Sequence, residues 1–261
     1  MNAAGLPILT YHAFDLSGQV TSTCPRWFET TLARLTEAGL RALDLESWIA
    51  SGRPSLPRTY AITIDDGLRS ILDVAEILQR YKAVATVFLV TDRVGSDNQW
   101  PGQPAWVRRE RLLSWSEIAD LQSIGVRFAA HGQSHIPLDR CDDRRIENEL
   151  RASRVAVEQK VGQSCSLLAY PYGRSSRRVR EAAQRQFQAA FGTRFDLASQ
   201  AQDRFDLSRL DAYYFQSAKS LDRLTAAGVG LDRWLWARRA LRAARSLPPR
   251  LSTPGPRLAL S

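Results

Sequence analysis

"YAITIDDG", residues 60–67, is an apolar run that leads directly into two adjacent carboxylates and a glycine. This pattern predicts a buried strand that ends at Asp65 and Asp66. Because adjacent residues on a strand point to opposite faces, the two carboxylates cannot form a simple bidentate clamp, and we expect each to have its own role. Taken alone, the same residues could also form an ordinary solvated Asp-Asp-Gly turn. The choice between these readings depends on the rest of the chain.

Short apolar runs alternate with longer helical patterns along the chain. Strand-like runs occupy residues 6–14, 83–90, 126–132, 166–173, 187–193 and 207–214. Helical patterns occupy residues 25–39, 70–81, 114–125, 142–162 and 177–186. About seven strand–helix repeats predict an α/β protein with a parallel sheet and helices outside it, either an open doubly wound sheet or a (β/α) barrel. No GxGxxG follows the first strand, which disfavours dinucleotide binding.

The composition is that of a basic globular chain. Its 261 residues are 44% apolar and carry a net charge of +9, almost all of it from arginine. This balance suits anionic partners such as phosphates, acidic glycans or anionic lipid heads, although a solvated arginine-rich surface would explain it equally well. Because there is neither zinc-finger spacing nor an RNA-binding sheet motif, we do not expect nucleic acid as a partner.

The cysteines and the N-terminus favour a reducing compartment. The three cysteines form no CxxC pair, so they do not indicate a disulfide framework. Residues 1–14 have no basic segment, no long apolar segment and no small-residue cleavage site. No stretch approaches the ~18 uninterrupted apolar residues of a spanning helix. We therefore expect a soluble, cytoplasmic protein.

The chain is expected to divide into a main domain, residues 1–225, and a basic tail, residues 226–261. Residues 231–245 form an arginine-rich amphipathic pattern whose apolar positions include Trp234, Leu235, Trp236 and Leu241. Such a helix could contact an anionic membrane surface peripherally. Arg238 interrupts its apolar face, so solvent exposure or packing against the domain is the alternative. A Pro-rich segment that we expect to be disordered follows.

Chemically versatile side chains follow several predicted strands. His131 and His135 lie four residues apart just past one strand, and this spacing in a helical turn would place two imidazoles on one side, as a metal site requires. His12, the Asp65–Asp66 pair and Tyr172 also lie at strand ends. The carboxyl ends of parallel strands share one face, which carries the active site in such folds. We therefore expect these residues to meet.

Two histidines and one carboxylate form a metal-binding set that leaves open coordination positions. Neutral nitrogen with a carboxylate suits Zn²⁺ or another first-row divalent ion. Such an ion lowers the pKa of water and polarises a carbonyl group. The second carboxylate is then free to accept a proton as a general base. This assigns one aspartate of the pair to the ion and the other to the proton.

These stretches resemble three motifs of the polysaccharide deacetylase family, the carbohydrate esterases that share the NodB homology domain. "TIDDG", residues 63–67, resembles TFDDG with Ile64 in place of Phe, and "HGQSH", residues 131–135, resembles H(S/T)xxH with Gly132 in place of Ser or Thr. "YPYG", residues 170–173, resembles the core of RxPYG. The motif order and intervals also fit, over roughly residues 6–215. The resemblance implies a distorted (β/α)7 barrel.

The resemblance also implies roles for individual residues. Asp65 would be the general base, and the metal ligands would be Asp66, His131 and His135. The backbone N–H of Tyr172 would help to hold the oxyanion of the tetrahedral intermediate. The implied cofactor is a divalent metal ion, with Zn²⁺ as the first choice among first-row metals.

The sequence departs from the family pattern at two places. The arginine of the third motif falls on Ala169, and Arg209 in the last predicted strand is our candidate to replace it, with an ordinary strand-edge charge as the alternative. The family's late catalytic histidine is missing, because no histidine follows His135. By exclusion, and by resemblance to exopolysaccharide N-deacetylases with an N-terminal Tyr-His motif, His12 is assigned as the general acid. A core histidine at a strand end is the alternative.

We therefore expect a hydrolase that removes N-acetyl or N-formyl groups from an amino sugar in an oligosaccharide or a lipid-linked intermediate. A hydrolase of a linear or cyclic non-sugar amide is the enzymatic alternative, and a non-catalytic glycan-binding domain is the other. Residues 92–112 are expected to form a loop over the mouth of the site. Aromatic rings that could stack on a sugar, or simply pack in the fold, are Trp100, Trp106 and Tyr213.

Overall fold

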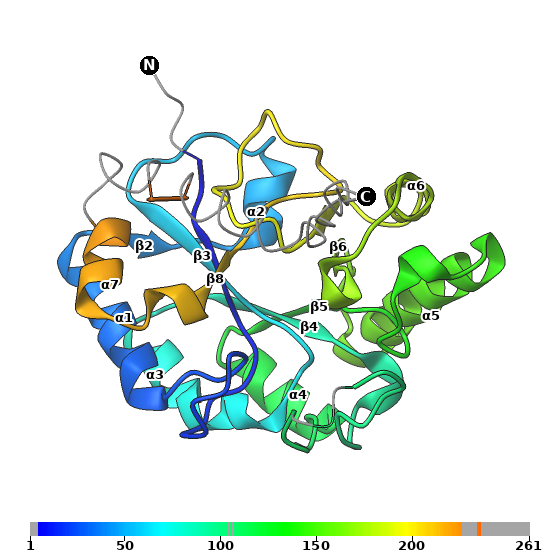
Figure 1. Cartoon of the computed structure of the whole chain (residues 1–261), viewed down its shortest axis with the longest axis horizontal. Helices are drawn as coiled ribbons and strands as arrows, with labels where there is room; N and C mark the ends of the chain where they lie inside the picture. The colour runs from blue at the N-terminus through cyan, green and yellow to red at the C-terminus, as the bar shows by residue number, and fades with distance from the viewer. Residues whose placement is uncertain (1–4, 104, 106, 226–233, 236–261) are drawn as a thin grey trace, which may run out of the picture.

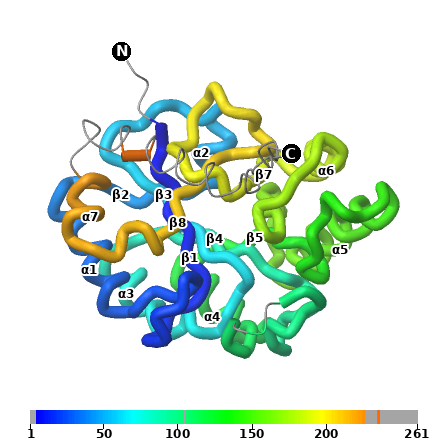
Figure 2. The backbone as a smooth tube through the Cα atoms, viewed as in Figure 1, coloured from blue at the N-terminus to red at the C-terminus, as the bar shows by residue number. Residues whose placement is uncertain are grey.

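The computed structural model describes residues 5–103, 105, 107–225 and 234–235. A parallel sheet forms its centre, with the strand order β7-β6-β5-β4-β3-β1-β8 and with β2 paired to β3 beside this path. The strands are β1 Ile8–Tyr11, β2 Arg41–Ala42, β3 Thr59–Ile64, β4 Ala85–Leu89, β5 Arg127–Ala130, β6 Leu167–Ala169, β7 Ala189–Phe191 and β8 Leu210–Asp211. Although β1 is the first strand and β8 the last, they pair side by side (Figure 2).

The segment before β8 brings the two edges of the sheet together. Phe191 at the end of β7 forms a parallel bridge with Leu207. The N–H of Gly192 donates to the carbonyl of Leu207, and the N–H of Arg209 donates to that of Arg194. The sheet therefore curls into a distorted (β/α)7 barrel, as the sequence predicts.

Helices lie around the outside of the sheet (Figure 1). The α-helices are α1 Pro25–Glu37, α2 Leu45–Ala50, α3 Ala75–Arg80, α4 Trp115–Ser123, α5 Asp143–Val161, α6 Arg177–Gln184 and α7 Ala218–Thr225. Short 3-10 helices are η1 Arg69–Val74, η2 Thr91–Arg93, η3 Leu138–Arg140, η4 Pro171–Gly173 and η5 Ala212–Phe215. Helix α4 begins with a capping box, because Ser114 and Glu117 each accept from the other's backbone N–H.

Several segments differ from the sequence-based expectation. The helix expected over residues 70–81 is split into η1 and α3, because Val74 takes φ −121° and ψ 4°. The strands expected over residues 166–173 and 207–214 are shorter, since η4 follows β6 and η5 follows β8. Strand β2 and helix α2 were not expected, although Asp44 accepts from the N–H of Ser47 as an ordinary helix N-cap.

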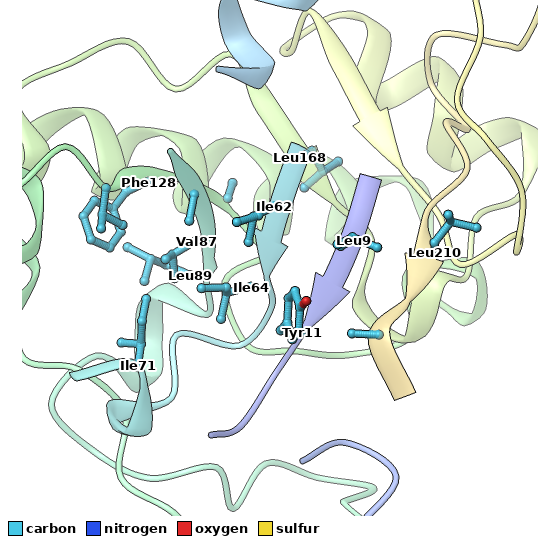
Figure 3. Packing of buried hydrophobic residues seen from close by; sticks show 14 of the residues in the cluster. Leu9, Tyr11, Ile62, Ile64, Ile71, Val87, Leu89, Phe128, Leu168 and Leu210 are labelled. Atoms are coloured by element: carbon cyan, nitrogen blue, oxygen red, sulfur yellow. The ribbon is translucent and has the colours of Figure 1, made fainter. Parts of the chain in front are cut away.

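The outer face of the sheet carries the larger core. Alternate strand residues point outward and pack with buried side chains of the helices, as Figure 3 shows for Leu9, Tyr11, Ile62, Ile64 and Val87. Each of these side chains is almost completely buried. Burying apolar side chains stabilises the fold by roughly 1.5–3 kcal/mol for each large residue.

The inner face of the sheet changes character along the strands. Toward the amino ends it is apolar, where Ile8 and Ala61 cluster with Trp48 of α2. Further along it becomes polar, because Thr10 of β1 pairs in register with Thr63 of β3 and their hydroxyl oxygens lie 3.0 Å apart. The next inward positions are those that follow the strands. The site therefore lies at the carboxyl end of the barrel, away from α2.

Little of the expected tail falls within the described residues. Trp234 packs its ring 5.7 Å from that of Phe195 and 5.2 Å from that of Phe215, and Leu235 is buried. These two side chains therefore lie against the domain. The rest of residues 226–261, including most of the amphipathic pattern over 231–245, lies outside the described residues. Among the described residues, no helix is both long and apolar enough to cross a membrane.

Candidate active site

The backbone at Asp66 explains how two adjacent carboxylates serve one site. Asp65 follows β3 and keeps the inward direction of Thr63, two residues earlier. A regular strand would then point Asp66 outward, but Asp66 takes φ 71° and Gly67 takes φ 72°. A Cβ at Gly67 would also lie 2.8 Å from the Leu89 side chain, so this turn requires glycine. The left-handed turn brings Asp66 back to the inner side.

Asp66, His131 and His135 form a cluster that fits a metal ion. The Asp66 Oδ1 atom lies 3.4 Å from Nε2 of His131 and 3.2 Å from Nε2 of His135. One possible ligand atom from each residue lies within 4.8 Å of the other two. Two ligand atoms that are each about 2.1 Å from a tetrahedral ion are about 3.4 Å apart, so the spacing suits Zn²⁺ or a similar ion.

The surroundings of His131 select the nitrogen that would bind the ion. Its Nδ1 lies 2.8 Å from the carbonyl oxygen of Ala169, to which an Nδ1–H donates. This leaves the lone pair on Nε2, the nitrogen that faces Asp66. Burial would lower the pKa of His131, but the charges of Asp65 and Asp66 outweigh it and raise that pKa.

His135 lies between two aromatic rings. Its imidazole centroid is 4.1 Å from Trp100 and 4.6 Å from Tyr172. Its Nδ1 is buried and has no hydrogen-bond partner in the described part of the chain. Burial lowers the pKa of His135, which favours the neutral, metal-binding imidazole. Burial would raise the pKa of Asp66, but the histidines hold it well below its usual range, so the carboxylate is ionised.

Asp65 is held by Arg209, the arginine proposed to replace the one expected at Ala169. The two guanidinium NH groups donate to the two carboxylate oxygens at 2.7 and 2.8 Å. Arg209 also donates to the Gly192 carbonyl at 3.0 Å and to the Thr63 hydroxyl at 3.3 Å, and only 2% of its surface is exposed. Burial would raise the pKa of Asp65, but Arg209 outweighs it and lowers that pKa. The carboxylate is therefore ionised and fixed in direction.

His12 and Tyr172 complete the set of residues that the sequence brought forward. The Nε2 of His12 lies 3.9 Å from Oδ2 of Asp65, and 29% of the His12 side chain is exposed. Tyr172 takes φ 59°, and its ring is 39% exposed beside His135. Asp66, His135 and Tyr172 are thus three left-handed non-glycine residues in one site, a form of backbone strain that is typical of functional sites.

The aromatic residues considered for sugar stacking differ in how exposed their side chains are. Trp100 is only 4% exposed and packs on His135, which favours the packing alternative and leaves its ring little surface for a sugar. It lies in the polar segment 92–112, so part of that segment covers the cluster formed by Asp66, His131 and His135. Tyr213 is 41% exposed, and its role stays a prediction. Trp106 lies outside the described residues.

One buried residue near the site was missed by sequence reasoning. Glu149 of α5 is 1% exposed and contacts the chain between His131 and His135. The signal was a carboxylate on the apolar side of a helix, three residues after Ile146 and next to Leu150, both of which are buried. Charged residues are almost never fully buried without partners, so this position indicated a buried polar contact.

Comparison with known proteins identifies the family. The family model described as polysaccharide deacetylase matches residues 52–189, more than half of the chain. This chain belongs to the polysaccharide deacetylase family. It is accordingly an enzyme of the carbohydrate deacetylase class, the hydrolases that act on carbon–nitrogen bonds other than peptide bonds. The matched range contains the three candidate metal ligands, Asp65 and Tyr172, but neither His12 nor Arg209.

One sequence relative and two solved structures are similar to this chain at low sequence identity. The Bacillus subtilis protein YxkH, by name a polysaccharide deacetylase, is 22% identical over 212 residues, which cover 79% of this chain and 71% of YxkH. The Streptococcus pyogenes deacetylase PplD, solved in complex with acetate, is 21% identical with a TM-score of 0.69 and covers 80% of this chain and 92% of its own. A de-N-acetylase from Aggregatibacter actinomycetemcomitans is 15% identical with a TM-score of 0.65, covering 79% and 94%.

Proposed function

We propose that this deacetylase is metal-dependent and removes N-acetyl groups from an amino sugar within a glycan. The observation that carries the proposal is the convergence of Asp66, His131 and His135 on one point, beside an Asp65 carboxylate fixed by Arg209. The names of PplD, solved with acetate, and of the de-N-acetylase support acetate and a free amine as products.

The protein residues divide the chemical work among themselves. A divalent ion held by the Asp66 cluster would supply a Lewis acid for the acyl carbonyl and lower the pKa of water. The ionised Asp65 accepts the proton of the attacking water as general base. The backbone N–H of Tyr172 donates to the oxyanion, which is the former carbonyl oxygen of the acyl group in the tetrahedral intermediate. His12, which is partly exposed and lies 3.9 Å from Asp65, gives a proton to the departing amine as general acid.

The closing experiment is an acetate-release screen with the purified chain. Acetate is measured for N-acetylated oligosaccharides and lipid-linked N-acetylated sugars, and formate for their N-formyl counterparts. For linear and cyclic non-sugar amides, the carboxylate product of hydrolysis is measured instead. Metal content is measured in parallel. We expect one or more N-acetylated sugars to be hydrolysed, with activity lost on chelation and restored by Zn²⁺.

Asp65→Asn is the matched control, because it keeps the shape of the side chain and removes its basicity. Loss of the base is expected to lower kcat/KM by about 10²–10⁴-fold. Full activity in this variant would contradict the role of Asp65. Release from non-sugar amides alone would contradict the substrate class, and metal-free protein that still bound glycan without hydrolysis would favour a binding domain.

A further inference from the structure

The loop between His131 and His135 is short of internal hydrogen bonds. Gly132 takes φ 77°, and a Cβ there would lie 3.3 Å from Cγ of Pro171 and 3.6 Å from Oε2 of Glu149. A serine or threonine at this position would be strained and crowded, which gives the departure at Gly132 a physical cause. With glycine there, the loop has no side-chain hydroxyl at this position. Its backbone groups must find partners outside the loop.

Two carbonyl groups of the loop, those of Gly132 and Gln133, accept hydrogen bonds from η2, which follows β4. The N–H of Asp92 donates to the carbonyl of Gln133 at 2.9 Å, and the N–H of Thr91 lies 3.4 Å from the carbonyl oxygen of Gly132. The Gln133 side chain also donates to Asp92 at 3.1 Å. Helix η2 therefore holds one edge of the loop.

Two N–H groups of the loop, those of Gln133 and Ser134, donate to a single side chain, Glu149. Its Oε2 accepts from the backbone N–H groups of Gln133 and Ser134, each at 2.9 Å. Its Oε1 accepts from the Ser134 hydroxyl at 2.6 Å and pairs with Arg145 at 2.7 Å. The carboxylate is 1% exposed, so it holds these groups without competition from water.

We propose that Glu149 is a positioning residue of the metal site. It acts through Gln133 and Ser134 to keep His131 and His135 at the spacing that one ion requires. His135 depends on this support most, because its backbone is left-handed at φ 57° and its Nδ1 has no partner in the described chain to orient the ring. The inference rests on the proposed metal site, and its test measures metal binding rather than turnover.

The test compares Glu149→Ala, Glu149→Gln and Glu147→Ala. Glu149→Ala leaves two partly buried backbone N–H groups without their acceptor, and we expect the affinity for Zn²⁺ or Co²⁺ to fall by about 10–100-fold, the usual effect of losing a residue that supports the metal ligands. Glu149→Gln keeps one oxygen for the two N–H groups, so it should recover much of that loss. Glu147 lies on the same helix but pairs with Arg185 and Gln186, so Glu147→Ala should bind metal as the wild type does.

The readouts are metal affinity by chelator competition, the visible absorption spectrum of the Co²⁺-loaded protein, and the melting temperature of the metal-free protein. A changed Co²⁺ spectrum together with weaker binding in Glu149→Ala supports the proposal. A lower melting temperature with unchanged affinity and spectrum would assign Glu149 a purely structural role and overturn it. If Glu149→Ala does not fold, Glu149→Met takes its place, because it keeps most of the side-chain volume and removes both acceptor oxygens: wild-type affinity and spectrum overturn the proposal, and weaker binding with an altered spectrum supports it. Wild-type protein that binds neither ion would overturn the metal site itself, which is a different result from normal binding in the variants.

Discussion

The two faces of the same strands differ in what their side chains do. On the outer face, Leu9, Ile62 and Val87 join one large apolar core with the helices (Figure 3). The alternate strand residues point to the inner face. There Thr63 and Asp65 both contact Arg209. Strand alternation thus separates two tasks by a single position along the chain. The outer face supplies stability, and the inner face uses that rigid frame to hold buried charges close together.

The difference shows why charge can be buried here. Removing two ions from water costs several kcal/mol for each, and the cost is recovered only with good geometry and further hydrogen bonds. Arg209 meets this requirement with two hydrogen bonds to Asp65 and further ones to Gly192 and Thr63. The free energy of unfolding should therefore fall when a charge is removed from the inner face, and when side-chain volume is removed from the outer face.

The largest effect is expected for His12→Ala, at the exposed rim of the inner face. Loss of a general acid should lower kcat by about 10²–10⁴-fold while the metal content stays normal, because His12 is not part of the Asp66 cluster. Turnover on the best substrate of the acetate-release screen and metal analysis of the same sample test this. Loss of the bound metal would instead make His12 a ligand.

Arg209→Met comes next and tests charge pairing on the inner face. Removing Arg209 leaves Asp65 buried without its partner, which should lower the free energy of unfolding by about 3–5 kcal/mol. Urea unfolding of the metal-free protein measures the change. The double variant Asp65→Asn with Arg209→Met carries neither charge and should regain most of the stability. If Arg209→Met unfolds like the wild type, the pair is not a structural unit.

Leu32→Ala makes the corresponding change on the outer side. Leu32 of α1 is fully buried, and its truncation should lower the free energy of unfolding by about 2–5 kcal/mol through the cavity that it leaves. The activity of the folded fraction should stay within about twofold of wild type, since distant sites contribute independently. A large loss of kcat/KM in fully folded Leu32→Ala would show that the two faces are coupled.

The smallest effect is expected for Thr63→Val. The Thr63 hydroxyl accepts from Arg209 and lies 3.2 Å from the carbonyl oxygen of Leu9, so its loss should cost about 1–2 kcal/mol of unfolding free energy. Thr31→Val is the matched control on the outer side, because the Thr31 hydroxyl only donates to the carbonyl of Trp27 within helix α1. We expect a smaller change there. Equal changes would remove the distinction between the two faces at the level of single hydroxyls.

Much of the fold and of the site could be predicted from local pattern. Apolar runs and helical periodicity located most strands and helices, and polar residues at successive strand ends predicted that His131, His135 and the aspartates would meet. The family resemblance also led to Arg209 as the candidate replacement for the arginine expected at Ala169, and the structure places its guanidinium group on Asp65. These predictions worked because strand direction decides which residues share an edge.

The parts that were missed depend on backbone geometry and on long-range packing. The left-handed turn at Asp66 decides where its carboxylate points, and an Asp-Asp-Gly sequence is equally compatible with a surface turn. Residues 92–112 were expected to cover the site, but no local pattern indicates that Trp100 within them lies on His135. Strand β2 has two residues and depends on its pairing with β3, so its own sequence gives little signal.

The pairing of Asp65 with Arg209 has a consequence for the folding of the chain. The partners are 144 positions apart, and Arg209 reaches Asp65 only after the last strand has docked beside the first. A nascent or clipped chain that stops short of Arg209 would still contain every proposed metal ligand, yet the buried Asp65, the proposed base, would lack its counter-charge. Contacts this distant in sequence form late and slowly. Catalytic competence would then report that the whole barrel is complete.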